Sequence, residues 1–215
     1  MARKPSSRLN RSAGRPSTDD VQEIENLILQ VALGEFLERG YGGASLTRIV
    51  EQAGISKTTL YSRYGSKEEL FRAIIFNQIN RIDPGSLLKI DSIDCDLEQG
   101  LKSYANKMLE LNLQGEMLAV NKLINSESSR FPELGAAAAE RTRLGVVRIA
   151  DFIRRCTQAD GILCGNPELV AEAFIMMLRG WYMNVLLTNE TVTTAKRRKW
   201  VEGTVHILLS SKEHW

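Results

Sequence analysis

A run of hydrogen-bond donors follows Ser56. It contains two cations, two threonine hydroxyls and a phenol, on Lys57, Thr58, Thr59, Tyr61 and Arg63. Side chains of these types donate hydrogen bonds to phosphate oxygens and to base edges. Leu60 and Tyr64 lie four residues apart in the same run, so on a helix they share the opposite, core-facing side. The run therefore predicts a short helix that presents donors to nucleic acid.

The residues just before this run predict the joint of a helix-turn-helix. Ala53 is small enough for two helices to approach, Gly54 accepts a positive φ, and Ile55 fills the angle between the helices. Ser56 can cap the second helix, whose first turn then faces a major groove. A capped helical hairpin that binds a protein partner has the same pattern, so a helical protein-interaction module is the alternative.

Basic charge is concentrated near the N-terminus although the whole chain is nearly neutral. The 215 residues carry 28 lysines and arginines against 26 acids, a net charge of +2. Residues 39–67 hold five cations and Glu51 as the single acid, which places the donor run in a basic patch suited to phosphates. Residues 1–16 are rich in Arg, Ser, Pro and Gly and predict a disordered basic arm, with an inert solubilising tail as the alternative.

The elements around the donor run are four predicted helices joined by tight turns, which form a domain over residues 17–81. Ser17 with Asp20 matches a capping box, and apolar residues then recur every three or four positions until Gly40 ends the first helix. Ser66 opens a second capping box. The predicted helices cover about residues 17–39, 45–53, 56–64 and 66–80.

Residues 82–215 predict a second, larger helical domain. Beyond a polar linker over residues 83–95, apolar stripes at helical spacing cover about residues 97–111, 117–124, 133–157, 167–187 and 194–209. No strand pattern competes with them. The predicted fold class is all-α, with an N-terminal helix-turn-helix domain of three to four helices followed by a C-terminal helical bundle.

The order of these landmarks resembles the N-terminal domain of the TetR/AcrR transcriptional repressors. The resemblance covers about residues 21–75 and rests on Gly40-Tyr41, Thr47, Ile49, Ala53-Gly54-Ile55-Ser56, Thr59-Leu60-Tyr61-x-x-Tyr64 and Ser66-Lys67-Glu68-x-Leu70. Val50 stands where the family usually has Ala. Tyr64 replaces the more usual Phe, so its hydroxyl needs a partner or an exposed edge. Residues 127–134 also look like a segment common in AcrR-like regulatory domains.

The resemblance implies which side chains contact DNA. It places Thr47 and Arg48 near the DNA backbone and Lys67 at a phosphate. With the donor run, the predicted DNA-contacting residues are Thr47, Arg48, Ser56, Lys57, Thr58, Thr59, Tyr61, Arg63 and Lys67. Which of Lys57, Thr58 and Thr59 contacts bases stays open.

Sites for metals and catalysis are not expected. His206 and His214 have no cysteine or acid at metal-ligand spacing, and no phosphate-binding glycine loop or nucleophile motif occurs. We therefore expect no metal, no cofactor and no enzyme activity. Three cysteines without a CxxC motif argue against a disulfide framework. The absence of a predicted secretory signal or membrane span gives the cytoplasm as the expected location.

The second domain offers candidates for a ligand pocket. Met and aromatic side chains on successive helices suit an adaptable apolar cavity, and the predicted pocket residues are Tyr104, Met108, Met117, Asn121, Phe174, Met177 and Trp181. Phe152 belongs to the same group of side chains, and Glu127 and Arg148 are candidate polar contacts for a ligand. A solid core, or surface ion pairs for the two charged residues, explains the same pattern.

The last two helices predict a dimer interface. The stretch from residue 171 to 187 is apolar on more faces than one subunit can cover, although Arg179 interrupts it. Two such helices from each of two subunits can close a four-helix interface. The predicted contact residues are Phe174, Leu178, Trp200, Val201, Val205 and Leu208. A purely monomeric core is the alternative.

The function expected from these observations is homodimeric, sequence-specific regulation of transcription. The resemblance implies a repressor that binds a palindromic operator in double-stranded DNA and is released by a small-molecule effector. The C-terminal bundle is then the effector-binding and dimerisation domain, and no membrane partner is expected.

Overall fold

The structure is a computed structural model that describes residues 18–81, 96–162, 164–188, 190–212 and 215. Within these ranges the chain forms nine α-helices and no β-strand, which confirms the predicted all-α fold. The predicted basic arm over residues 1–16 and the predicted linker over residues 83–95 lie outside the described residues.

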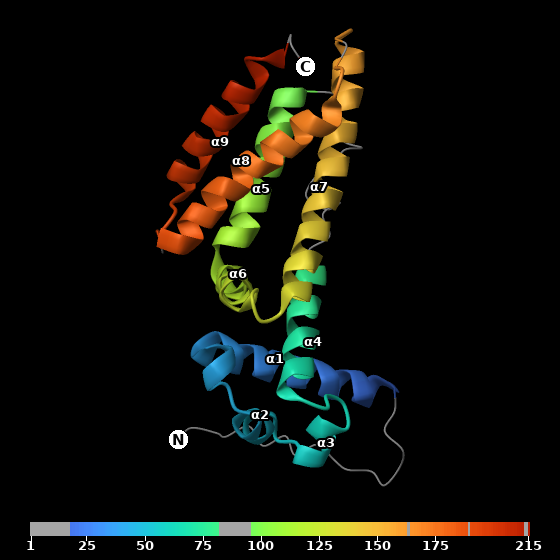
Figure 1. The fold of residues 1–215 in the computed structure, drawn as a ribbon, viewed down its shortest axis with the longest axis vertical. Helices are drawn as coiled ribbons and strands as arrows, with labels where there is room; N and C mark the ends of the chain where they lie inside the picture. The colour runs from blue at the N-terminus through green and yellow to red at the C-terminus, as the bar shows by residue number, and fades with distance from the viewer. Residues whose placement is uncertain (1–17, 82–95, 163, 189, 213–214) are drawn as a thin grey trace, which may run out of the picture.

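The first four helices lie together at the lower end of the molecule in Figure 1. They are α1 (Thr18–Gly43), α2 (Leu46–Ala53), α3 (Lys57–Tyr61) and α4 (Lys67–Asn80). The regular turns of α1 end at Gly40, whose φ of 65° is not helical. α4 begins at the predicted capping box: the Ser66 hydroxyl accepts from the Glu69 amide at 3.1 Å, and the Glu69 carboxylate accepts from the Gly65 amide at 2.8 Å.

Five further helices form the upper bundle. They are α5 (Leu97–Leu113), α6 (Gly115–Glu127), α7 (Pro132–Ala159), α8 (Pro167–Thr188) and α9 (Thr194–Leu209). α7 and α8 pack along each other most extensively, and α9 packs on α5. α7 runs the length of the bundle, and its first turns reach α4 (Figure 1).

Two apolar clusters fill the molecule, and they do not separate at the break between α4 and α5. One cluster joins α5, α7, α8 and α9. The other joins α1–α4 with Val120 and Leu123 of α6, with Phe131, and with Leu134 of α7. Residues on both sides of the predicted domain boundary therefore share one core.

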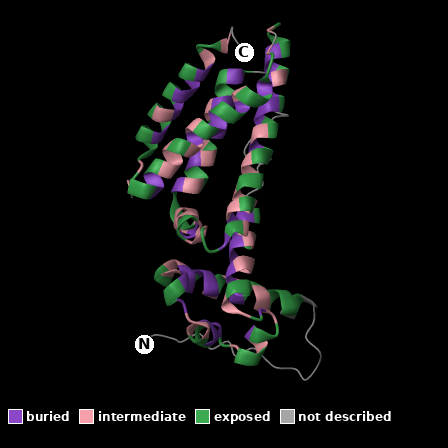
Figure 2. Ribbon diagram, viewed as in Figure 1, coloured by how far each residue is buried: buried purple, intermediate pink, exposed green. Residues whose placement is uncertain are grey.

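α8 is unusually apolar for a helix of this bundle. Among the described residues it is the helix that is long and apolar enough, by length and composition, to cross a membrane, but only 33% of its most apolar window is buried in the subunit. Phe174 and Leu178 on its inner face are fully buried in the bundle cluster, as in a core helix. Figure 2 shows exposed positions recurring along α8 and α9.

Candidate nucleic-acid interface and ligand cavity

The joint between α2 and α3 has the geometry of a helix-turn-helix. Gly54 ends α2 with φ 64° and ψ 28°, the left-handed conformation that glycine adopts without a Cβ penalty. Ile49, Val50 and Ala53 of α2 are buried, so the Val50 that departs from the family pattern still packs in the core. The predicted motif therefore rests on a packed scaffold.

The donors of α3 divide into two groups. Ser56 caps the helix: its hydroxyl accepts from the Thr59 amide at 3.0 Å and lies 2.8 Å from the Thr59 hydroxyl. These two hydroxyls are therefore occupied with each other, and Thr59 is only half-exposed. Lys57, Thr58 and Tyr61 are exposed, and Tyr61 retains 51% of its surface. The structure thus narrows the accessible donors of this helix to these three.

The core side of α3 is anchored as the spacing predicted. Leu60 is 0% exposed and Tyr64 is 9% exposed in the N-terminal cluster. The Glu25 carboxylate of α1 lies near the Tyr64 hydroxyl. Burial, together with the nearby Glu25 carboxylate, raises the pKa of Tyr64. The hydroxyl that departs from the family pattern therefore has a polar group beside it.

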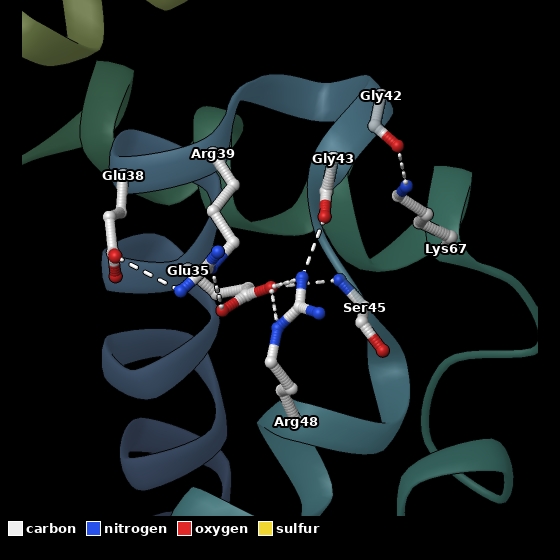
Figure 3. Close-up of polar contacts among 8 residues, drawn as sticks. All are labelled: Glu35, Glu38, Arg39, Gly42, Gly43, Ser45, Arg48 and Lys67. Atoms are coloured by element: carbon white, nitrogen blue, oxygen red, sulfur yellow. Dashed lines mark hydrogen bonds and ion pairs between the residues drawn. The ribbon is translucent and has the colours of Figure 1, made fainter.

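A buried carboxylate on α1 holds the start of α2 (Figure 3). One Glu35 oxygen accepts from the Ser45 amide at 2.9 Å and from the Nε and Nη2 of Arg48 at 2.8 and 2.6 Å. Arg48 Nη2 also donates to the Gly43 carbonyl at 2.7 Å, and Arg39 Nε lies 3.5 Å from the second Glu35 oxygen. The hydrogen bonds from Arg48, opposed by burial, lower the pKa of Glu35.

These bonds differ from the role expected for Arg48. The family resemblance implied that Arg48 lies near the DNA backbone, whereas its guanidinium is turned toward α1 and bonds Glu35 there (Figure 3). Arg48 therefore acts in this structure as the tie between α1 and α2. Thr47, its neighbour, is exposed.

Lys67 lies at the start of α4, beside the joint between α1 and α2. Its Nζ donates to the Gly42 carbonyl at 3.3 Å and sits 4.8 Å from the centre of the Tyr41 ring. Of the five cations counted over residues 39–67, Arg39 and Arg48 pair with acids in the described part of the chain, while Lys57, Arg63 and Lys67 form none of its ion pairs. Fewer cations are thus available to a phosphate than the five counted in the sequence.

An aromatic group joins this domain to the start of α7. Phe131 lies 5.0 Å from Tyr41 and 4.9 Å from Phe71 between ring centres. Arg130 lies 4.9 Å from the centre of the Tyr41 ring. Arg72 of α4 donates to Glu133 of α7 at 2.5 Å. Residues 130–133 therefore connect the bundle to the helix-turn-helix domain.

A cavity of about 270 Å³ lies in the bundle, between α5, α6, α7 and α8, with α4 reaching its edge. Of the predicted pocket residues, Tyr104, Met108, Met117 and Asn121 line it. Phe174, Met177 and Trp181 do not. Phe174 is fully buried in the core, and Trp181 stacks on Trp200 with ring centres 4.8 Å apart.

The polar residues of the cavity differ from those expected. Asn121 has partners, because its amide donates to the backbone carbonyl and side-chain oxygen of Asn112 at 3.2 and 3.3 Å. Glu127 and Arg148 are not among the lining residues. Arg141 of α7 and Arg179 of α8 line the cavity instead. The sequence contained one signal for them, the interruption of the apolar α8 by Arg179.

Comparison with known families agrees with both parts of the chain. The family described as bacterial regulatory proteins, tetR family, matches residues 28–74. The family described as AefR-like transcriptional repressor, C-terminal domain, matches residues 99–211, more than half of the chain. The chain belongs to the TetR family. As a TetR-family protein it is a transcriptional regulator with a helix-turn-helix DNA-binding domain, and not an enzyme.

Individual relatives of this TetR-family regulator are distant. The transcriptional repressor ComR of Escherichia coli K12 is 27% identical over 138 residues, 64% of each chain, so the match spans just under two thirds of that relative. The transcriptional repressor AcnR of Corynebacterium glutamicum is 25% identical over 195 residues, covering 90% of this chain and 96% of its own. The structure of the flavonoid-responsive regulator FrrA has a TM-score of 0.68 at 24% identity, covering 88% of this chain and 97% of that one, which shows a shared fold.

The structure of this TetR-family chain also corrects which residues of α8 and α9 can meet a partner subunit. Phe174, Leu178, Val201 and Val205 are fully buried in their own subunit, and Leu208 is 7% exposed. Trp200 is half-buried against Trp181. Periodicity in a helix that is apolar nearly all round does not reveal which face turns inward. The predicted dimer-contact residues lie on the face that packs into their own subunit.

The outer face of the same helices carries other apolar side chains. Leu169, Met176 and Leu187 of α8 are 59%, 45% and 67% exposed, and Ile207 of α9 is 65% exposed.

Within the described residues, no group of three or more histidine, cysteine or acidic side chains is placed to hold a metal ion.

Proposed function

We propose that this TetR-family regulator is a homodimeric repressor that binds a palindromic operator and leaves it when a small molecule occupies the bundle cavity. The observation that carries the DNA-binding part is the position of Lys57, Thr58 and Tyr61. They are exposed on a capped helix whose opposite side is buried through Leu60. The repressor assignment draws support from ComR and AcnR, relatives that are named as repressors.

Each subunit would place α3 in a major groove. Lys57 and Thr58, in the first turn of α3, are the side chains we expect at base edges, since the N-terminal residues of such a helix reach the bases. Tyr61, Arg63 and Lys67 would bond phosphates. Thr47 is exposed on α2 and would contact the DNA backbone. Arg48 would act indirectly, by fixing α2 against α1.

The outer faces of α8 and α9 would form the dimer interface. Leu169, Met176 and Ile207 expose apolar surface there. Ala173 and Gly180 are exposed on α8 between the larger side chains and would let a partner helix approach closely. A two-fold interface of these helices would cover apolar surface that one subunit leaves in water.

Release from DNA would run through α4. Its Ile79 lines the cavity, while Leu70 and Phe71 near its other end are fully buried in the N-terminal cluster. A ligand that binds more tightly to a dimer with shifted α4 helices would favour that form of the dimer. In that form the distance between the two α3 helices would no longer match half-sites about 34–36 Å apart.

The test begins with selection of an operator from random DNA by the full-length protein. Fluorescence anisotropy then compares the wild type with the triple variant K57A/T58A/Y61A and with R155A, a change of an exposed arginine on α7. We expect the triple variant to lose at least about 100-fold in affinity, because each good contact contributes about 1–3 kcal/mol. R155A is expected to match the wild type.

Salt dependence separates DNA binding from the protein-interaction alternative. Phosphate contacts make the logarithm of the binding constant fall linearly with the logarithm of the salt concentration, and removing Lys67, which we expect at a phosphate, should reduce that slope by about 1. Unchanged operator affinity in the triple variant, or no selected sequence at all, would show that α3 does not bind DNA.

A further inference from the structure

The bundle cavity has one strongly basic wall. Arg141 and Thr142 come from α7, Arg179 and Tyr182 from α8, and Tyr104 from α5. Arg179 Nη1 donates to the Thr142 hydroxyl at 2.5 Å, which directs its guanidinium toward α7, where Arg141 is the adjacent residue. Two guanidinium groups on neighbouring helices therefore belong to the same wall.

No carboxylate balances this wall among the described residues that line the cavity. Arg179 belongs to none of the ion pairs among the described residues, and its guanidinium donates to a neutral hydroxyl. Guanidinium groups bind carboxylates through charge-assisted hydrogen bonds, often two in parallel. A bound anion would thus give Arg179 a charged acceptor, which no described lining residue supplies.

The tyrosines add donors to the same wall. Tyr104 is 4% exposed, and its hydroxyl would lie 2.9 Å from a Cβ added at Gly145, so the glycine makes room for it on α7. Burial raises the pKa of Tyr104 to about 12, which keeps the hydroxyl protonated at neutral pH. Burial also raises the pKa of Tyr182. Both phenols can therefore donate to a ligand oxygen.

Much of the remaining lining is apolar and the cavity is small. Methionine and branched aliphatic side chains make up this apolar part of the lining: Met108, Met117, Val120, Ile124, Met183 and Leu186. The volume of about 270 Å³ lies just below the 300–1,000 Å³ typical of sites for drug-sized molecules. A single ring or a short chain fits this space better than a long lipid.

We propose that the effector is a small organic acid, with its carboxylate at Arg141 and Arg179 and its apolar body against the methionine and aliphatic side chains of the lining. This assignment rests on the proposed function, because it names the ligand class of the same cavity. A cation would be repelled by the two guanidinium groups, and a neutral ligand would leave Arg179 bonded to a neutral hydroxyl rather than to an anion.

The experiment compares acids with their uncharged amides. Isothermal titration calorimetry on the free full-length protein uses 3-phenylpropanoate and octanoate, each beside the amide of the same carbon skeleton. We expect at least one acid to bind about tenfold or more tightly than its amide, since a charge-assisted pair is stronger than a neutral hydrogen bond.

Variants then locate the carboxylate. R179Q and R141Q should each weaken the acid by about tenfold or more, and R179K should retain part of the affinity because it keeps the charge but loses the two-pronged donor geometry. R148Q is the matched control, because Arg148 is exposed on α7 and does not line the cavity. Far-ultraviolet circular dichroism checks that each variant is folded.

The outcomes separate this proposal from the DNA-binding one. If neither acid binds the wild type, if acid and amide bind alike, or if R179Q and R141Q both bind the acid as the wild type does, the organic-acid proposal is wrong. Because calorimetry contains no DNA, that failure leaves operator binding intact. Failure of operator binding would instead appear in the anisotropy of the unliganded protein.

Discussion

Glu35 brings a negative charge into the joint on which the orientation of the helix-turn-helix depends. Its side chain is 0% exposed, yet one oxygen accepts three hydrogen bonds from Ser45 and Arg48. A buried carboxylate is costly unless it is bonded in this way. The consequence is that α2 is held on α1 by a charged contact rather than by apolar packing alone.

Replacing this charge should destabilise the protein in a pH-dependent manner. E35Q is expected to lower the free energy of unfolding by about 1.5–3 kcal/mol at pH 7, the usual worth of hydrogen bonds to charged groups. Because the folded pKa of Glu35 lies below its ordinary value of 4.5, this stability is present above that value and is lost as the pH falls through the folded pKa.

Urea denaturation of wild type and E35Q from pH 7 down to pH 3 measures the difference. E38Q is the control, because Glu38 is an exposed neighbour on α1. A constant difference between wild type and E35Q across this range would contradict the role assigned to the charge.

Tyr64 gives a second test at the scale of one group. Y64F keeps the ring in the core but removes the hydroxyl that lies near the Glu25 carboxylate, so we expect a loss of about 0.5–1.5 kcal/mol in the free energy of unfolding. Y61F removes the hydroxyl of an exposed tyrosine and should leave stability unchanged within about 0.5 kcal/mol. Thermal or urea unfolding that finds equal losses in both variants would refute a special role for the Tyr64 hydroxyl.

Among the elements, the turn between α2 and α3 depends on backbone conformation rather than on space. A Cβ added at Gly54 would have nothing within 4 Å, but the φ of 64° is strained for any other residue. G54A should therefore cost about 1–2 kcal/mol through the left-handed conformation alone.

Gly34 is the matched control for this change. A Cβ there also meets nothing within 4 Å, and Gly34 is an exposed residue within α1 with no positive φ. G34A should raise the free energy of unfolding by about 0.4–1 kcal/mol because alanine restricts the unfolded chain. Urea denaturation should therefore show a lower free energy of unfolding for G54A and a higher one for G34A. A change of the same sign in both variants would show that the backbone conformation of Gly54 does not determine the effect of the substitution.

The short helix α3 is stabilised by both local and tertiary interactions. Five residues cannot hold a helix in isolation, since nucleation is costly. The Ser56 cap and the burial of Leu60 stabilise this helix despite its short length. The capping residue and the apolar spacing were both readable in the sequence, which is why a short helix was predicted here, although α3 ends at Tyr61 and does not reach Tyr64.

At the scale of the whole molecule, α8 carries more apolar surface than its subunit covers. A dimer through its outer face predicts a species of twice the 24.1 kDa chain mass by light scattering. M176E places a carboxylate in that face, and its two-fold copy repeats it in the partner. We expect the dimer to weaken by about 100-fold or more, because a buried unpaired charge costs several kcal/mol.

V147E is the matched control, because Val147 of α7 is 44% exposed and Met176 is 45% exposed. It should remain dimeric. If M176E dimerises as strongly as V147E, the interface does not include this face of α8.

The sequence by itself determined the helical composition, the helix ends at Gly40 and Gly54, and the presence of a donor helix, because these follow from local periodicity, caps and backbone freedom. Four of the residues it proposed for a ligand pocket, Tyr104, Met108, Met117 and Asn121, line the bundle cavity. Only the tertiary structure decided that Arg48 bonds Glu35, that Phe131 enters the N-terminal core, that Arg141 and Arg179 share a wall, and that Phe174 faces inward. Each of these depends on how distant helices are rotated and packed against one another, and a period of 3.6 residues does not specify that rotation when a helix is apolar on several sides.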